Sequence, residues 1–216
     1  MEHPNQYHQS VHQPVHPPAN QHPKKSEGLK SIFATIGILL LAPVVAILLT
    51  MFVFQSYEVD GPSMESTLQN KDRLIVYKLP RTIASITNKT YQPNRGDIVV
   101  FTRKGTIDYN NTENKQLIKR VIGVPGDRVV IRDGTVTIYN AEHPDGFNPD
   151  EGQPYAANNF TTPGNVDITV KEGEVFVMGD NRHNSLDSRA FGTVQDKHIV
   201  GVLALRVYPF SKVDAY

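Results

Sequence analysis

The pattern of apolar residues separates one long uncharged run from a region of short alternating segments. The run extends from Ile32 to Phe54 without a charged residue. At 1.5 Å per residue, about 23 residues give roughly 34 Å of helix, which is enough to cross the hydrocarbon core of a bilayer. We therefore predict one transmembrane anchor over residues 29–55.

Residues 56–216 contain short segments of β-branched and apolar residues, separated by turn signals that contain Gly, Pro, Asn and Asp. No amphipathic pattern of three helical turns interrupts them. This indicates an all-β domain, built as a barrel or as a coiled antiparallel sheet. Residues 140–164, rich in Pro, Gly, Asn and Asp, are predicted to be an insertion. The predicted strands cover residues 73–77, 97–102, 117–122, 128–132, 135–139, 166–170, 174–178 and 199–208.

Residues 1–28 are rich in His, Pro, Gln and Asn and almost lack large aliphatic side chains. Such a segment cannot bury enough apolar surface to offset the entropy of ordering, so we predict a disordered tail. Its histidines have no carboxylate or cysteine beside them at a ligand spacing, and we expect no metal site there. They are His3, His8, His12, His16 and His22.

The residues that flank the apolar run indicate its orientation. Lys24, Lys25 and Lys30 precede it, and acidic residues from Glu58 onward follow it. Basic flanks stay on the cytoplasmic side, so we predict a single-pass protein with a cytoplasmic tail and an extracytoplasmic domain. A cleaved signal peptide is the alternative, but the run is longer than an h-region and residues 55–58 offer no small-x-small cleavage site.

Composition narrows the classes of function. The 216 residues have a formal net charge of zero and are 39% hydrophobic, which allows one or two domains with a real core. Such even charge gives no reason to expect a nucleic-acid partner. The chain has no cysteine, so it has neither disulfides nor thiolate metal sites. The sequence does not indicate an oligomeric state.

Three stretches carry candidate chemistry, and the first is residues 59–68, directly after the anchor. It contains Gly61, Pro62 and Ser63. Alone, these residues are typical of a tight turn with a solvated serine. Their position places any reaction of Ser63 close to the membrane surface.

The second stretch, residues 119–127, places Lys119 and Arg120 in an otherwise apolar strand. Neighbours on a strand face opposite sides, so in a closed sheet one of the two does not face bulk water. A buried lysine has a lowered pKa and can act as a neutral general base toward a serine. The alternative is a surface lysine whose stem lies along the sheet.

In the third stretch, residues 174–192, an apolar strand leads into a dense run of Gly, Asp, Asn, Arg and Ser. These residue types form local hydrogen bonds and hold a loop in one shape. A solvated loop is the alternative, although it would not need so many carboxylates, guanidinium groups and hydroxyls.

Together these stretches resemble type I signal peptidase, a membrane-bound serine protease with a Ser/Lys dyad. Residues 61–68 look like its nucleophile box and residues 119–127 like its general-base box. Residues 96–101 resemble its structural strand, and residues 179–189 resemble its last box. The resemblance extends from the anchor to Tyr208 and implies the coiled all-β catalytic core of that family.

The resemblance implies a role for each matched position. Ser63 would be the nucleophile, Lys119 the general base, and Ser185 the group that orients the Lys119 amine. No reaction step needs a further carboxylate or a cofactor. The residues expected to hold the loop are Arg120, Asp180, Asp187 and Arg189.

The chain departs from the family at three positions. Ser66 stands where proline is more frequent, and His183 where an acidic residue is frequent. Gly61 stands where some members use a hydroxyl to help hold the oxyanion. Here the oxyanion hole is expected to use mainly backbone N–H groups, notably that of Ser63.

The family implies that the substrates are secretory preproteins, cut after a small residue with another small residue two positions earlier. One argument is independent of the resemblance, because Ser63 lies at most roughly 30 Å of extended chain beyond the span. Its substrates must therefore be presented near the bilayer surface. The alternatives are an anchored peptidase that cuts itself or a regulatory partner, and a catalytically silent anchored β-module.

Overall fold

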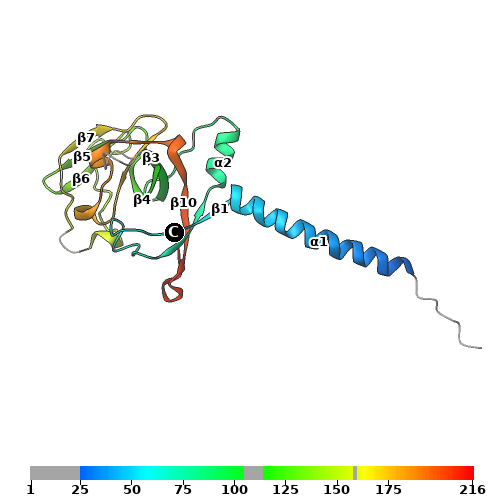
Figure 1. Ribbon diagram of the computed structural model, residues 1–216. Helices are drawn as coiled ribbons and strands as arrows, with labels where there is room; N and C mark the ends of the chain where they lie inside the picture. The colour runs from blue at the N-terminus through cyan, green and yellow to red at the C-terminus, as the bar shows by residue number, and fades with distance from the viewer. Residues whose placement is uncertain (1–24, 105–113, 158–159) are drawn as a thin grey trace, which may run out of the picture. The chain divides into compact units, whose positions relative to one another are not determined.

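The computed structural model describes residues 25–104, 114–157 and 160–216. Helix α1 (Lys25–Phe52) opens the described chain, and its residues Lys30–Phe52 are long and apolar enough to cross a membrane (Figure 1). It includes four residues that the sequence assigned to the tail; residues 1–24 of that predicted tail lie outside the described residues. Strand β1 begins at Phe54, one residue before the predicted end of the anchor at residue 55.

The larger sheet has eight strands, and all of its pairings are antiparallel. Its order is β1-β2-β10-β3-β4-β8-β9, with β11 paired to β10. The strands are β1 (Phe54–Glu58), β2 (Arg73–Tyr77), β3 (Ile98–Lys104), β4 (Asn114–Gly123), β8 (Glu174–Met178), β9 (Val194–Gln195), β10 (Ile199–Tyr208) and β11 (Asp214–Ala215).

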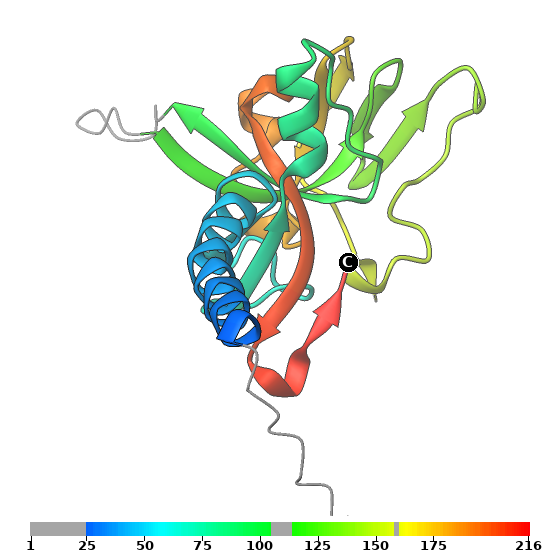
Figure 2. The ribbon, with the colours of Figure 1, turned by 90° about the vertical axis from the view of Figure 1, so that its right-hand side faces the viewer.

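A second sheet of three antiparallel strands has the order β6-β5-β7. Its strands are β5 (Arg128–Arg132), β6 (Thr135–Tyr139) and β7 (Val166–Thr169). Apolar side chains from these strands pack against Phe176 and Met178 of β8, which joins the two sheets. Figure 2 shows this sheet beside the larger one.

The short helices occupy the connections. α2 (Leu79–Ile86) follows β2 and lies beside β10 in both views (Figures 1 and 2). α3 (Ser188–Phe191) lies in the loop after β8. The 3₁₀ turns are Pro154–Ala156, Arg182–Asn184, Asp196–His198 and Phe210–Lys212.

The predicted all-β antiparallel core is confirmed. The ends of β2, β5, β6, β8 and β10 coincide with those predicted from the sequence. The sequence left open whether the domain is a closed barrel or a coiled antiparallel sheet. In the described residues the sheet is open, because no hydrogen bonds pair β1 with β9. Strands β1, β9 and β11 and helix α2 were not predicted.

One core cluster supports the loop between β1 and β2. Val59, Met64 and Leu68 of this loop are buried against Leu74, Ile98 and Leu203 of the larger sheet. Met64 and Leu68 are fully buried, and burial of such a side chain contributes roughly 1.5–3 kcal/mol. The loop that carries Ser63 is therefore anchored to the larger sheet by its buried apolar side chains.

Candidate active site

Ser63 lies in this loop, and the backbone conformation and hydrogen bonds of its neighbours fix its position. The preceding Gly61 has φ +98°, a conformation that glycine adopts without steric cost. Its N–H donates to the Asn70 side chain at 3.1 Å. After Ser63, Glu65 N–H donates to the Pro62 carbonyl at 3.0 Å, which closes a turn around the serine.

Lys119 of β4 reaches this serine directly. Its Nζ lies 2.6 Å from Ser63 Oγ and also donates to the Ile118 carbonyl at 2.8 Å. Lys119 is 3% exposed, whereas Ser63 is half-buried. Of the two alternatives for the Lys-Arg pair, the structure therefore shows the buried lysine rather than the surface one.

Burial lowers the pKa of Lys119 from 10.5 to about 8, although the negative charges of Asp187 and Asp180 oppose the shift. At pH 7, a group with a pKa of about 8 is neutral in roughly one molecule in ten, against roughly one in three thousand for a pKa of 10.5. A neutral amine can accept a proton from a hydroxyl at hydrogen-bond distance. The geometry thus allows Lys119 to activate Ser63 as a nucleophile.

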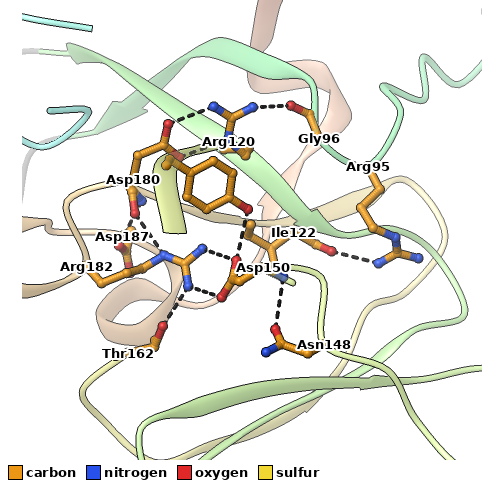
Figure 3. Close-up of polar contacts among 12 residues, drawn as sticks. Arg95, Gly96, Arg120, Ile122, Asn148, Asp150, Thr162, Asp180, Arg182 and Asp187 are labelled. Atoms are coloured by element: carbon orange, nitrogen blue, oxygen red, sulfur yellow. Dashed lines mark hydrogen bonds and ion pairs between the residues drawn. The ribbon is translucent and has the colours of Figure 1, made fainter. Parts of the chain in front are cut away.

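Arg120 points to the other side of the strand and pairs with Asp180. Its Nε and Nη2 lie 2.9 Å and 2.7 Å from the two carboxylate oxygens, and its Nη1 donates to the Gly96 carbonyl at 2.8 Å (Figure 3). Thr67 donates a further hydrogen bond to Asp180. The pair connects β4, the loop after β8 and the loop that carries Ser63.

Asp187 stabilises the loop after β8 through hydrogen bonds to other residues of that loop. It is fully buried, and it accepts hydrogen bonds from Nε and Nη2 of Arg189 at 2.8 Å each. The Gly179 N–H also donates to it at 3.1 Å. Burial alone would raise the pKa of Asp187, but the Arg189 guanidinium, together with hydrogen bonds from Ser185 and the Gly179 N–H, outweighs burial and lowers it. Asp187 is thus held in its charged form.

Ser185 lies in the same loop, and its buried hydroxyl is close enough to the Asp187 carboxylate to help lower the pKa of that group. The hydroxyl packs against Gly179, where an added Cβ would come within 2.3 Å of Ser185 Oγ and 2.4 Å of the Ser63 carbonyl. Within the described chain, no hydrogen bond joins Ser185 to Lys119. Its predicted orienting role therefore stays a prediction.

Asn181 is a residue that sequence reasoning did not single out. Its backbone N–H donates to the Ser63 carbonyl at 3.1 Å, and its side-chain amide donates to the Pro62 carbonyl at 3.2 Å. These bonds attach the loop after β8 to the backbone on both sides of the serine. No local sequence signal marks the role, since the two segments are more than a hundred residues apart.

The predicted insertion contributes a buried ion pair to this loop. Asp150 accepts two hydrogen bonds of 2.6 Å from Arg182, which also donates to Thr162 and to the Gly179 carbonyl (Figure 3). Tyr155 donates to Asp150 at 2.9 Å. Residues 140–164 therefore carry a partner of the loop, a role that the sequence did not predict.

A groove of about 270 Å³ opens beside Ser63 and Lys119. One wall is β1 with the residues after it, and the other is the first half of β4. Its lining includes Tyr57, Val59, Gly61, Leu74, Leu117 and Leu186. β1 is an edge strand, and β4 pairs with β8 only from Arg120 onward. Both walls therefore present strand edges to an extended peptide.

The backbone N–H of Ser63 points to no hydrogen-bond acceptor among the described residues. It is free to donate to an oxygen that lies beside Ser63 Oγ, as an oxyanion hole requires. The Gly61 N–H already donates to Asn70. In the described part of the chain, no three His, Asp or Glu side chains form a possible metal site; the tail histidines fall outside that part.

Comparison with known proteins identifies the family of this chain. The family described as "Signal peptidase, peptidase S26" matches residues 32–208. Signal peptidase I of Bacillus licheniformis is 32% identical over 192 residues, which cover 88% of this chain and 96% of that protein. Signal peptidase I S of Bacillus subtilis is 34% identical, over 88% of this chain and 97% of that protein.

A crystal structure of a signal peptidase I from Enterococcus faecalis is 30% identical and has a TM-score of 0.40, covering 52% of this chain and 97% of that one. The extent of the family match, from within α1 to the end of β10, includes every residue of the site described above. The chain belongs to the signal peptidase family, peptidase S26.

Proposed function

We propose that this protein is a membrane-anchored serine endopeptidase that removes N-terminal signal peptides from secretory preproteins after small residues. Ser63 is its nucleophile and Lys119 its general base. The observation that carries the proposal is the 2.6 Å contact between Lys119 Nζ and Ser63 Oγ, in a chain of the signal peptidase family.

The reaction follows from the two partners of Lys119. The neutral amine takes the Ser63 proton, and the serine oxygen attacks the scissile carbonyl to form a tetrahedral intermediate. The Ser63 N–H stabilises the oxyanion. The protonated amine then gives its proton to the leaving amine, and an acyl-enzyme remains. Lys119, neutral again, activates the water that hydrolyses this ester.

The loop residues act by positioning. Asp180 with Arg120, and Asp187 with Arg189, hold the loop after β8 against the nucleophile loop. Ser185, whose buried hydroxyl lies beside Gly179 near the Ser63 carbonyl, orients the Lys119 amine once a substrate is bound, as the family resemblance implies. The groove takes the residues before the cleaved bond as an extended segment between the edges of β1 and β4.

The membrane arrangement is part of the proposal. α1 crosses the bilayer once, with the basic flank at the cytoplasmic side and the catalytic domain outside. Strand β1 follows α1 after a single residue, so Ser63 lies at most roughly 40 Å of extended chain beyond the end of α1. The apolar segment of a secretory preprotein would present its cleavage site at that depth.

The test is cleavage of a model precursor with an Ala-x-Ala site by the full chain in detergent. We expect release of the signal peptide with a single new N-terminus, and no release by Ser63→Ala. Ser66→Ala removes an exposed hydroxyl from the same loop and should leave the rate near that of the parent.

Three results would contradict the proposal. Cleavage by Ser63→Ala at the parent rate would remove Ser63 from the mechanism. If the precursor stays intact while the chain cuts itself or an anchored regulatory protein, the activity belongs to that narrower class of peptidase. If no substrate is cut at all, the chain is a silent module.

A further inference from the structure

Helix α2 carries an apolar stripe that the domain core does not cover. Leu79, Ile83 and Ile86 recur at positions i, i+4 and i+7, which lie on one face of a helix. Ile83 is 51% exposed and Ile86 is 73% exposed, whereas Leu79 is half-buried. Ala84 is the only buried residue of the helix. The stripe therefore faces away from the protein interior.

The first turn of α2 is hydrogen-bonded to the end of the apolar helix α1. Lys78, directly before α2, donates from Nζ to the Met51 carbonyl at 2.8 Å. Its N–H donates to the Val53 carbonyl at 2.7 Å, and Thr82 Oγ1 donates to the Phe52 carbonyl at 3.1 Å. The last carbonyls of a helix have no partner within it, and here α2 supplies partners. The start of α2 is therefore fixed at the outer end of the span.

This attachment sets the height of α2 above the bilayer core. The headgroup layer on each side of the core is about 5–8 Å thick. Ile86 lies four residues after Thr82, which is about 6 Å along a helix. Ile83 and Ile86 therefore remain within the headgroup layer at any tilt of α2.

We propose that α2 is an interfacial helix that inserts Leu79, Ile83 and Ile86 into the boundary between headgroups and acyl chains. The proposal rests on the membrane anchoring proposed above. A protein partner fits the surface less well, because three aliphatic side chains bury on the order of 300 Å², and a specific interface needs roughly 1,000 Å². A bilayer needs no such area, since α1 already supplies the attachment.

The consequence concerns the active site. β2 connects the loop that carries Ser63 to α2, and only Lys78 lies between β2 and α2. A second contact with the membrane would therefore restrict how the catalytic domain tilts about the end of α1. The groove beside Ser63 would be held at one depth, where an extended segment leaving the bilayer can enter it.

The chain contains no tryptophan, so a single introduced tryptophan reports its own environment. The full chain is reconstituted in phosphatidylcholine–phosphatidylglycerol vesicles that contain lipids brominated near the headgroup end of the acyl chain. The probe is Ile86→Trp. Ser85→Trp is the matched control, because Ser85 is exposed but lies one turn after Arg81, whose guanidinium donates to the Lys197 carbonyl of the domain. Leu41→Trp, within α1, tests the anchoring separately.

We expect Ile86→Trp to emit at shorter wavelength than Ser85→Trp and to be quenched at least about twofold more strongly. Equal quenching of the two variants would overturn the proposal. So would an unquenched Ile86→Trp with water-like emission, or one with blue-shifted emission that the lipids do not quench, which would mean that protein covers the stripe. If Leu41→Trp is quenched in these cases, the anchoring stands and α2 alone is excluded from the interface.

Discussion

Asp150 and Arg182 form an ion pair whose side chains are only 5% and 1% exposed. Both carboxylate oxygens accept hydrogen bonds from the guanidinium at 2.6 Å. Asp150→Ala removes one partner and leaves the positive charge of Arg182 buried without a carboxylate. The hydrogen bonds of Arg182 to Thr162 and to the Gly179 carbonyl remain, but they do not neutralise the charge.

The loss of one partner from a buried ion pair costs about 3–5 kcal/mol of unfolding free energy. For a domain of this size, each kcal/mol shifts the melting temperature by about 2–4 °C, so we expect a decrease of about 6–20 °C. Asp150→Ala combined with Arg182→Met leaves no buried charge. The double variant should therefore melt at a higher temperature than Asp150→Ala alone.

The chain provides a matched control in Arg128 and Asp167. This pair has the same two-pronged geometry, with distances of 2.7 Å and 2.6 Å, but its side chains are 55% and 47% exposed. Solvent screens such a pair, so Asp167→Ala should melt close to the parent. The assay is thermal unfolding of the full chain in detergent, followed by far-UV circular dichroism. A decrease for Asp150→Ala no larger than that for Asp167→Ala would refute the reasoning.

Two further predictions concern Lys119. Lys119→Arg should be as inactive in precursor cleavage as Lys119→Ala, with a far-UV spectrum like the parent's, because a guanidinium cannot give up its proton at working pH; substantial cleavage would leave Ser63 without its base. Lys119→Met should be inactive yet more stable, by up to roughly 3 kcal/mol, because a pKa lowered from 10.5 to about 8 reports the cost of burying the charge. The gain in unfolding free energy over the parent, measured by denaturant unfolding, should be full below pH 8, shrink as the pH rises toward 10.5 and then vanish. If Lys119→Met is less stable than the parent at pH 7, burial of the charge is not the origin of the pKa shift.

Three of the strands whose ends the sequence predicts correctly have burial that alternates along the strand. In β2, Leu74 and Val76 face the core while their neighbours do not, and β5 and β6 show the same period. Such a pattern is local, so the sequence reveals it. The burial of β1 also alternates, but its sequence is mostly polar and follows the apolar run directly, so Phe54 reads as part of the span.

α2 was not predicted for a related reason. Its eight residues include the β-branched Thr82, Ile83 and Ile86, which do not favour a helix. The contacts of Lys78 and Thr82 with the end of α1 help to hold it. These contacts depend on tertiary structure and leave no period in the sequence.

The candidate site divides in the same way. The local sequence singles out Lys119, a lysine in an apolar strand, and the polar loop that contains Asp187, whereas the residues around Ser63 alone are typical of a tight turn. Asp150 and Asn181 give no such signal. Asp150 is one acidic residue among several in a polar segment, and only the fold brings it to Arg182, 32 residues away.

The pH dependence of kcat/KM for precursor cleavage tests the central claim, that a neutral Lys119 activates Ser63. This parameter reports the pKa of groups in the free enzyme. Burial sets the pKa of Lys119 at about 8, so kcat/KM should rise roughly tenfold per pH unit below that value and level off above it. A profile that is flat through pH 8, or one that keeps rising until the ordinary lysine pKa of 10.5, would contradict the claim.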